Sequence, residues 1–292
     1  MLDSMNSPAF SAHEHPPSDL PFTHSIQLWV QDAFGRILRE HIPPNATGTF
    51  VRRRGRNYIV TARHVADAVH TTSTGQSRAP TIAMKSNGVI LNLSRISSGG
   101  MRHSLRSVAA DCHEASLDVA IAPLNDFFQA RLFDHSLKTP IDLDAWSEPK
   151  WPSVRYCLAA GYPDEHKAWT QVGDSLGIES LFVTPIVELV STLDPFRPTF
   201  TLMTKMETPH GFHFSGMSGG PVYAIDQGQR TSSAVNLLPI GIVFEGHPSS
   251  GLAEDQGNDG SKFLSDRDVL FRVLTLTPTH FDNWLRNVGL LK

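Results

Sequence analysis

The chain has 292 residues, a formal net charge of −4 and a sequence pI near 6.4. This balance gives no electrostatic reason to expect binding to nucleic acid or to an anionic membrane surface. Hydrophobic residues make up 40% of the sequence, and the length suits one large domain with a substantial core. No apolar run approaches the ~18 residues that a membrane-spanning helix needs, so we expect no membrane association.

Residues 1–21 are expected to form a flexible tail, because Pro, Ser, His and acidic residues dominate them. The tail has no apolar segment of the kind that a secretory signal contains. The only cysteines are Cys112 and Cys157, fewer than secreted disulfide-stabilised domains usually carry. These features predict a cytoplasmic location, and whether the two cysteines are bonded stays open.

Alternating and apolar runs predict short strands through the first half of the chain. They cover residues 25–31, 35–41, 47–51, 57–61, 81–85, 89–93 and, as a weaker pattern, 104–109. The basic run 52–56 lies between two of them, and we interpret it first as a solvated hairpin turn, with a nucleic-acid patch as the alternative. Asn87-Gly88 is a strong hairpin signal between the two strands on either side.

The second half also carries strand patterns, which follow a connection at about 127–152. The expected strands are 154–161, 180–191, 199–206, 239–244 and 268–276. Residues 164–177 are charged and predict an exposed loop, and the polar stretch 248–268 predicts a long loop that controls access to a cleft. Thr279 is predicted to cap a C-terminal helix, with Asp282 three residues on, and Gly289 suits the end of that helix.

The stretch Gly216-Met217-Ser218-Gly219-Gly220-Pro221 lies between two of these apolar runs. Three glycines around one serine favour a tight turn that presents the serine hydroxyl at the surface. The backbone N–H groups of Gly216 and Ser218 can then point at one spot, which is the geometry that a tetrahedral oxyanion needs. A plain glycine-rich turn is the alternative for this stretch taken alone.

A serine hydroxyl becomes a good nucleophile only when a base takes its proton and an acid orients the base. His64 follows the apolar run 58–62, and Asp118 opens the apolar run 119–124. Asp111 and Glu114 are rival acids, but Asp118 is preferred because a buried, oriented acid is what the imidazole requires. The order along the chain is therefore His64, Asp118, Ser218.

These stretches resemble the trypsin-like (chymotrypsin-fold) serine peptidases, and in style they are most similar to bacterial HtrA-type catalytic domains. The matching pieces are TGTFVRRRGRNYIVTARHV from residue 47, LDVAIAPL from 117, AAGYP from 159, GMSGGPV from 216 and PIGIVFEG from 239. The resemblance implies an all-β fold of two six-stranded antiparallel Greek-key β-barrels with a C-terminal α-helix. One peptidase domain then covers 22–292: a first barrel at about 22–126, the connection, and a second barrel with the helix at about 153–292. No C-terminal PDZ domain is expected.

The resemblance implies a serine endopeptidase that hydrolyses polypeptide substrates by acyl transfer. Ser218 is the expected nucleophile, His64 the base and Asp118 the acid that orients it. The N–H groups of Gly216 and Ser218 form the expected oxyanion hole. Met217 stands where many digestive members of the family have Asp, so activation by insertion of a new N-terminus is not expected.

The resemblance also places the specificity pocket. By position, Phe212 and His213 line one wall, and Phe244, Glu245 and Gly246 form the other, where a substrate strand pairs by β-addition. Glu245 either favours a basic substrate side chain or points to solvent. His210 and His213 lack a third ligand at suitable spacing, so neither a metal nor another cofactor is expected.

Other classes of function stay open on the same fold. One is a catalytically silent binding or regulatory module, because a fold does not fix its function. Another is an esterase or acyltransferase that uses the same residues. An intermediate hypothesis is a latent peptidase, switched on by a regulatory protein partner or an effector, because a cytoplasmic peptidase without a processing signal needs restraint. Arg63 beside His64 and the bulky Phe212 suit a site that is closed at rest.

Overall fold

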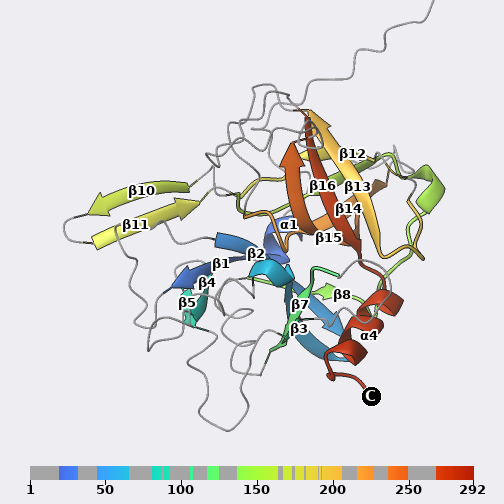
Figure 1. Ribbon diagram of the computed structural model, residues 1–292, viewed down its shortest axis with the longest axis horizontal. Coiled ribbons are helices and arrows are strands. Elements are labelled where there is room, and N and C mark those ends of the chain that lie inside the picture. The colour runs from blue at the N-terminus through green and yellow to red at the C-terminus, as the bar shows by residue number, and fades with distance from the viewer. Residues whose placement is uncertain are drawn as a thin grey trace, which may run out of the picture.

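A computed structural model of the chain describes residues 20–31, 45–65, 81–86, 89–92, 106–107, 117–124, 137–163, 167–172, 175–180, 182–189, 191, 193–205, 216–226, 236–248 and 268–292. Strands dominate these ranges (Figure 1). Helices α1 (Leu20–Thr23) and α4 (Pro278–Asn287) and the 3-10 helix η1 (Trp151–Ser153) are short. The strand predicted at 35–41 and the long loop predicted at 248–268 lie almost entirely outside the described residues.

The first half of the chain forms an eight-stranded sheet. Its strands are β1 (Ser25–Gln31), β2 (Asn45–Arg53), β3 (Arg56–Thr61), β4 (Thr81–Ser86), β5 (Val89–Asn92), β6 (Arg106–Ser107), β7 (Ala120–Pro123) and β8 (Ile141–Asp142). They run in the order β5-β4-β1-β2-β3-β7-β6, and β8 pairs with β2 in parallel. The predicted hairpins β2–β3 and β4–β5 are confirmed. Where a six-stranded barrel was predicted, no pairing between β5 and β6 closes this sheet in the described ranges.

The second half forms a closed barrel of six antiparallel strands, in the order β12-β13-β16-β15-β14-β9. These strands are β9 (Tyr156–Ala159), β12 (Ile186–Leu189), β13 (Thr199–Lys205), β14 (Pro221–Asp226), β15 (Asn236–Pro248) and β16 (Asp268–Thr275). Figure 1 shows the barrel beside the first sheet, with α4 near the carboxyl end of the chain. The mostly β class, a closed six-stranded barrel and a C-terminal helix are thus confirmed.

The loop predicted at 164–177 is wrong. Strands β10 (Lys167–Val172) and β11 (Ser175–Ser180) pair antiparallel along their whole length, from Lys167 opposite Ser180 to Val172 opposite Ser175. They form a separate two-stranded sheet that projects from the rest of the molecule (Figure 1). The two residues between the strands are Gly173 and Asp174, a common hairpin pair, and this local signal outweighs the charged composition.

Helix α4 completes the core of the first sheet, although it follows the barrel in the sequence. Its Phe281 and Trp284 are buried in one hydrophobic cluster with residues of β2, β3 and β7. The rings of Phe281 and Tyr58 meet edge to face with centroids 5.5 Å apart. Ile242 and Leu274 of the barrel belong to the same cluster, so the two halves share apolar contacts. A second cluster fills the barrel itself.

The cap of α4 differs from the prediction. Thr277, rather than Thr279, is the N-cap, and its hydroxyl accepts the N–H of His280 at 3.1 Å. Pro278 explains the shift, because proline favours the first helical position and the cap must precede it. Gly289, at φ 69°, ends the helix as predicted. Asp282 is therefore not part of a capping box.

Asp282 instead binds the basic turn, which is not the freely solvated hairpin that the sequence predicted. Arg53 donates to both carboxylate oxygens of Asp282, at 2.9 and 2.8 Å, and Arg54 approaches to 2.9 Å. Asp144 accepts the backbone N–H groups of Arg54 and Gly55 at 2.8 and 2.9 Å. The turn is thus fixed between α4 and the segment after β8, which composition alone did not reveal.

The sequence analysis also considered a membrane-spanning helix and the state of the two cysteines. In the described part of the chain, no helix combines the length and the apolar character needed to cross a membrane. Cys157 on β9 is buried and unbonded, and burial raises the pKa of its thiol to about 12. Cys112 lies outside the described residues.

Candidate active site

The serine turn is held on the first sheet by hydrogen bonds from one strand. The N–H of Thr47 donates to the carbonyl of Ser218 at 2.9 Å. The hydroxyls of Thr47 and Thr49 donate to the carbonyls of Gly216 and Gly219, each at 2.7 Å. All three donors lie on β2, so the turn that belongs to the barrel is positioned by the other half of the molecule.

Glycine is required in this turn for two reasons. Gly216 and Gly219 have φ values of 92° and 91°, which L side chains rarely adopt. A Cβ on Gly219 would also lie 1.9 Å from the carbonyl oxygen of Thr47 and 2.5 Å from the hydroxyl of Thr61. Thr61 ends β3 and stands three residues before His64. The serine turn therefore packs against the end of the strand that leads to His64.

Within the described residues, the amide groups predicted to form an oxyanion hole have no hydrogen-bond partner. In the described part of the chain, the N–H groups of Gly216 and Ser218 donate to no protein acceptor. The neighbouring Met217 is fully buried and lies beside Gly161, where a Cβ would come within 2.9 Å of its sulfur. Among the described residues the two N–H groups thus have no acceptor, while the central side chain of the turn anchors it in the barrel.

Asp118 holds His64 by two separate contacts. One carboxylate oxygen lies 2.6 Å from Nδ1 of the ring, and the other accepts the backbone N–H of His64 at 2.8 Å. Burial raises the pKa of the Asp118 carboxyl, but the hydrogen bonds and charge of His64, with the N–H of Arg63, outweigh it and lower that pKa below its ordinary value. The side chain of His64 is 55% exposed, so Asp118 orients the ring through Nδ1 while much of the ring is open to solvent.

Ser218 and His64 are not hydrogen-bonded to each other. Only 7% of Ser218 is exposed, and its hydroxyl donates to the carbonyl of Phe244 at 3.3 Å. The structure therefore brings Asp118 to His64, and Ser218 to Phe244. The serine turn lies against the end of β3, which precedes His64.

The predicted specificity pocket is described on one side only. Phe212 and His213 lie outside the described residues, as do the rival acids Asp111 and Glu114. On β15, Phe244 is buried, and the carboxylate of Glu245 pairs with Arg272 of β16 at 2.9 Å. The charge of Glu245 is thus already matched within the protein.

Three residues near the site were not identified as functionally relevant from the sequence. Thr47 and Thr49 belong to a stretch quoted for its resemblance, and both are fully buried. Two polar residues spaced two apart on one face of an apolar strand signal a buried hydrogen-bonding role. Arg272 left no such signal, because its partner Glu245 is distant in the sequence.

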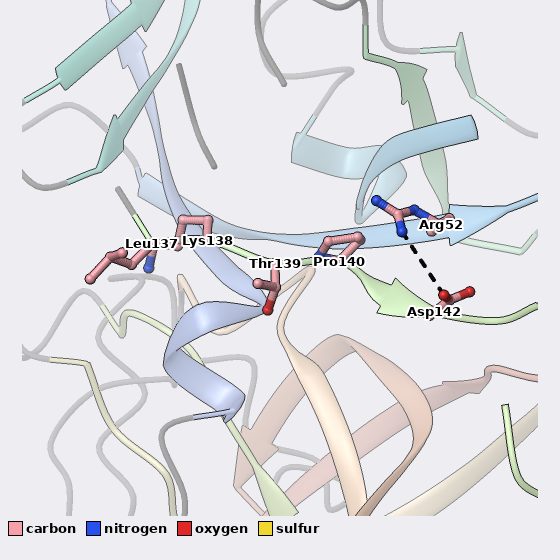
Figure 2. A pocket seen from close by; sticks show the side chains of 6 residues that line it. All are labelled: Arg52, Leu137, Lys138, Thr139, Pro140 and Asp142. Carbon is pink, nitrogen blue, oxygen red and sulfur yellow. Dashed lines mark ion pairs between the residues drawn. The ribbon is translucent and has the colours of Figure 1, made fainter. Parts of the chain in front are cut away.

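A cavity of about 410 Å³ lies apart from these residues (Figure 2). It is lined by Arg52, Leu137, Lys138, Thr139, Pro140 and Asp142. Figure 2 shows the ion pair between Arg52 and Asp142, whose charged groups are 4.0 Å apart, at one side of the cavity. None of the residues predicted to take part in catalysis or substrate binding lines it. Within the described ranges, no cluster of three His, Cys, Asp or Glu side chains suits a metal ion.

Several solved structures of proteases are similar to this chain. A thermostable serine protease, AL20, from an extremophilic microorganism is 15% identical, with 94% of this chain and 99% of that chain covered and a TM-score of 0.46. The protease Anisep from Arthrobacter nicotinovorans is 14% identical over 91% and 96%, with a TM-score of 0.41. An inactivated protease paralogue of the scabies mite is 12% identical over 94% and 99%, with a TM-score of 0.43. No protein-family model and no curated protein matches the chain.

Proposed function

We propose that this protein is a serine endopeptidase that uses Ser218 as nucleophile, His64 as base and Asp118 as the acid that orients it. The observation that carries the proposal is the double contact between Asp118 and His64, through Nδ1 and through the backbone N–H. A carboxylate that fixes both the ring and its backbone is the arrangement that general-base catalysis by histidine needs.

The proposed reaction uses the second ring nitrogen of His64 and the backbone N–H groups of the serine turn. In the neutral imidazole, a proton on Nδ1 that is donated to Asp118 leaves the lone pair on Nε2, which can take the Ser218 proton. The serine oxygen then attacks a peptide carbonyl, and His64 returns the proton to the leaving amine. The N–H groups of Gly216 and Ser218, which have no acceptor among the described residues, are suited to stabilise the oxyanion that forms. Water repeats the same steps to release the acyl group.

A second candidate function is a latent peptidase, or a catalytically silent module, on the same fold. The observation that favours it is the hydroxyl of Ser218, which donates to Phe244 rather than to His64. A latent enzyme has this serine in a resting position until substrate, a partner or an effector releases it. A silent module keeps the same arrangement permanently.

Labelling of the purified chain with a fluorophosphonate probe tests the proposal. Covalent labelling of Ser218 that is lost in both Ser218→Ala and His64→Ala supports a nucleophile activated by histidine. Ser153→Ala, which removes an exposed hydroxyl on η1, is the matched control and should label as the unmodified chain does. Labelling that survives in Ser218→Ala would place the nucleophile elsewhere. No labelling under any condition would favour the silent module.

A further inference from the structure

Two opposite charges, Arg52 and Asp142, stand side by side at the cavity without a hydrogen bond between them (Figure 2). The two residues are paired in register on the neighbouring strands β2 and β8, so their side chains lie on the same face of the sheet. Nη1 of Arg52 is 4.0 Å from Oδ2 of Asp142, longer than the about 2.7–3.2 Å of N–H···O hydrogen bonds. The side chains are 39% and 41% exposed, so a molecule in the cavity can reach both.

The guanidinium of Arg52 is oriented from the opposite side. Its Nε donates to Oδ1 of Asn57, 3.0 Å away, and Asn57 is buried on β3. Among the described residues, Nη1 and Nη2 of Arg52 have no hydrogen-bond acceptor. Oδ1 of Asp142 accepts the N–H of Asp144 at 2.9 Å, and Oδ2 has no donor in the same part of the chain. The cavity therefore presents a directed pair of donors beside a charged acceptor.

Leu137 and Pro140 give the cavity an apolar wall. Leu137 has a φ of 53°, a left-handed conformation that bulky L residues rarely adopt, and it is 76% exposed. The next two residues hold the segment in place, because Nζ of Lys138 and the N–H of Thr139 donate to carbonyls of α1 at 2.7 and 3.0 Å. Strained backbone of this kind is common where proteins bind ligands. An exposed leucine is thus fixed beside the two charges.

The three features together define the chemistry of a ligand. A carboxylate suits the two Nη groups of Arg52, because a guanidinium can bind it through two parallel hydrogen bonds. An ammonium group suits Oδ2 of Asp142. Since Nη1 and Oδ2 are only 4.0 Å apart, the opposite charges of the ligand must lie close together, as they do around the α-carbon of an amino acid. A peptide carries these charges at its two ends and does not meet this requirement.

We propose that this cavity binds a free α-amino acid with an apolar side chain. The carboxylate binds Arg52, the ammonium group binds Asp142, and the side chain packs on Leu137 and Pro140. The volume of about 410 Å³ lies near the lower end of the about 300–1,000 Å³ typical of small-molecule sites. No residue proposed for catalysis lines the cavity, so the inference does not depend on the peptidase function.

Ligand analogues that lack one charge test the two polar contacts separately. Binding of L-leucine to the purified chain is measured by saturation-transfer NMR at pH 7. The matched controls are 4-methylpentanoate, which lacks only the ammonium group, and 3-methylbutylamine, which lacks only the carboxylate. Each should bind roughly ten- to a hundredfold more weakly than leucine, the range that a hydrogen bond to a charged group supports. Equal binding of leucine and either analogue would overturn the inference, and so would the absence of leucine binding up to its solubility limit.

Variants of the chain then locate the binding site. Arg52→Gln and Asp142→Asn should each weaken leucine binding by a similar factor, with folding checked by circular dichroism. Arg56→Gln, which removes an exposed arginine of the same hairpin that does not line the cavity, is the matched control and should bind as the unmodified chain does. Unchanged binding in Arg52→Gln would place the amino acid elsewhere and overturn the inference. If a variant fails to fold, the two analogues still decide the question on the unmodified chain.

Discussion

Two aspartates of this molecule, Asp118 and Asp282, each hold a basic partner and are used differently. Asp282, with 9% of its side chain exposed, binds Arg53 and Arg54, which keep their charge at any ordinary pH. Asp118, with 25% exposed, binds His64, whose imidazole can take up and release a proton in general-base catalysis. The pKa of each carboxyl is lowered, so the shift does not distinguish them. The basic partner distinguishes the two aspartates: the pair of Asp282 fixes a turn, and the pair of Asp118 can move a proton.

The largest expected effect comes from the nucleophile that the Asp118–His64 pair would serve. Ser218→Ala should lower turnover on the order of a million-fold if the three residues act as a unit. The measurement is the rate of hydrolysis of a peptide library, with folding checked by circular dichroism. Retention of most activity would mean that the titratable pair serves some other group.

Asp118→Asn should lower kcat about 10⁴-fold while the protein stays folded. An amide has a single acceptor oxygen, and when this oxygen accepts the backbone N–H of His64, the NH2 group faces Nδ1, so the ring loses the tautomer in which Nε2 has the lone pair. Steady-state kinetics and chemical denaturation are measured on the same preparation. A large loss of stability with little loss of rate would reverse the roles that we assign to the two aspartates.

The pH dependence of the rate offers a milder test of the same pair. The rate should fall as the pH drops if a histidine is the base, since an imidazole that already carries a proton cannot accept another. The carboxyl of Asp118, whose pKa lies below its ordinary value, stays ionised through this change. Measurement of kcat/KM from pH 8 to pH 5 checks this, and a flat profile would argue against a histidine base.

Asp282→Ala should leave the active-site rate intact but lower the free energy of unfolding by about 2 kcal/mol. This value lies between that of an exposed ion pair and that of a fully buried one, because Arg54 is half exposed and can regain water. Side-chain hydrogen bonds from Arg53 lower the pKa of Asp282 to about 2, so this stabilisation is present above about pH 4 and is lost between pH 4 and 2. Urea unfolding of both proteins at pH 7 and pH 3 measures it. An equal difference at both pH values would contradict the assignment.

The sequence analysis placed Asp118 and His64 in one predicted site but missed the contact between Asp282 and the basic turn, for a physical reason. His64, Asp118 and Ser218 stand in short stretches whose glycines and apolar strands are locally recognisable. The clamp of Arg53 and Arg54 on Asp282 joins residues 229 and 228 positions apart, and local patterns carry no trace of such contacts. The basic run was accordingly interpreted as solvated, and Asp282 as part of a cap.

The same reasoning explains the other differences between prediction and structure. The β10–β11 hairpin was missed because charged composition was weighted above the two-residue turn between its strands. The resting position of Ser218 depends on where β15 bulges, and the bulge at Phe244 is set by pairing with β16. Chain order identifies candidate groups, whereas the direction in which a hydroxyl points is a tertiary property.

Lys138 differs from both aspartate pairs, because it is a buried basic group without an acidic partner among the described residues. It is 1% exposed, its ammonium group donates to the carbonyl of Phe22 at 2.7 Å, and no carboxylate pairs with it in the described part of the chain. Burial lowers the pKa of Lys138 to about 7. In the unfolded chain its pKa is about 10.4, so between these two values the unfolded state binds more protons and stability rises with pH.

Lys138→Met should therefore remove a rise in unfolding free energy of about 2 kcal/mol at most between pH 7 and pH 9. The unfolding of both proteins in urea at the two pH values gives the double difference, in which the other titrating groups cancel. Were the two proteins to respond equally to pH, the lysine would keep its proton in the fold. The contact of its ammonium with the Phe22 ring, 3.5 Å from the centroid, would then be compensating for burial. The outcome thus decides whether an aromatic face replaces the carboxylate that Arg53 and His64 each have.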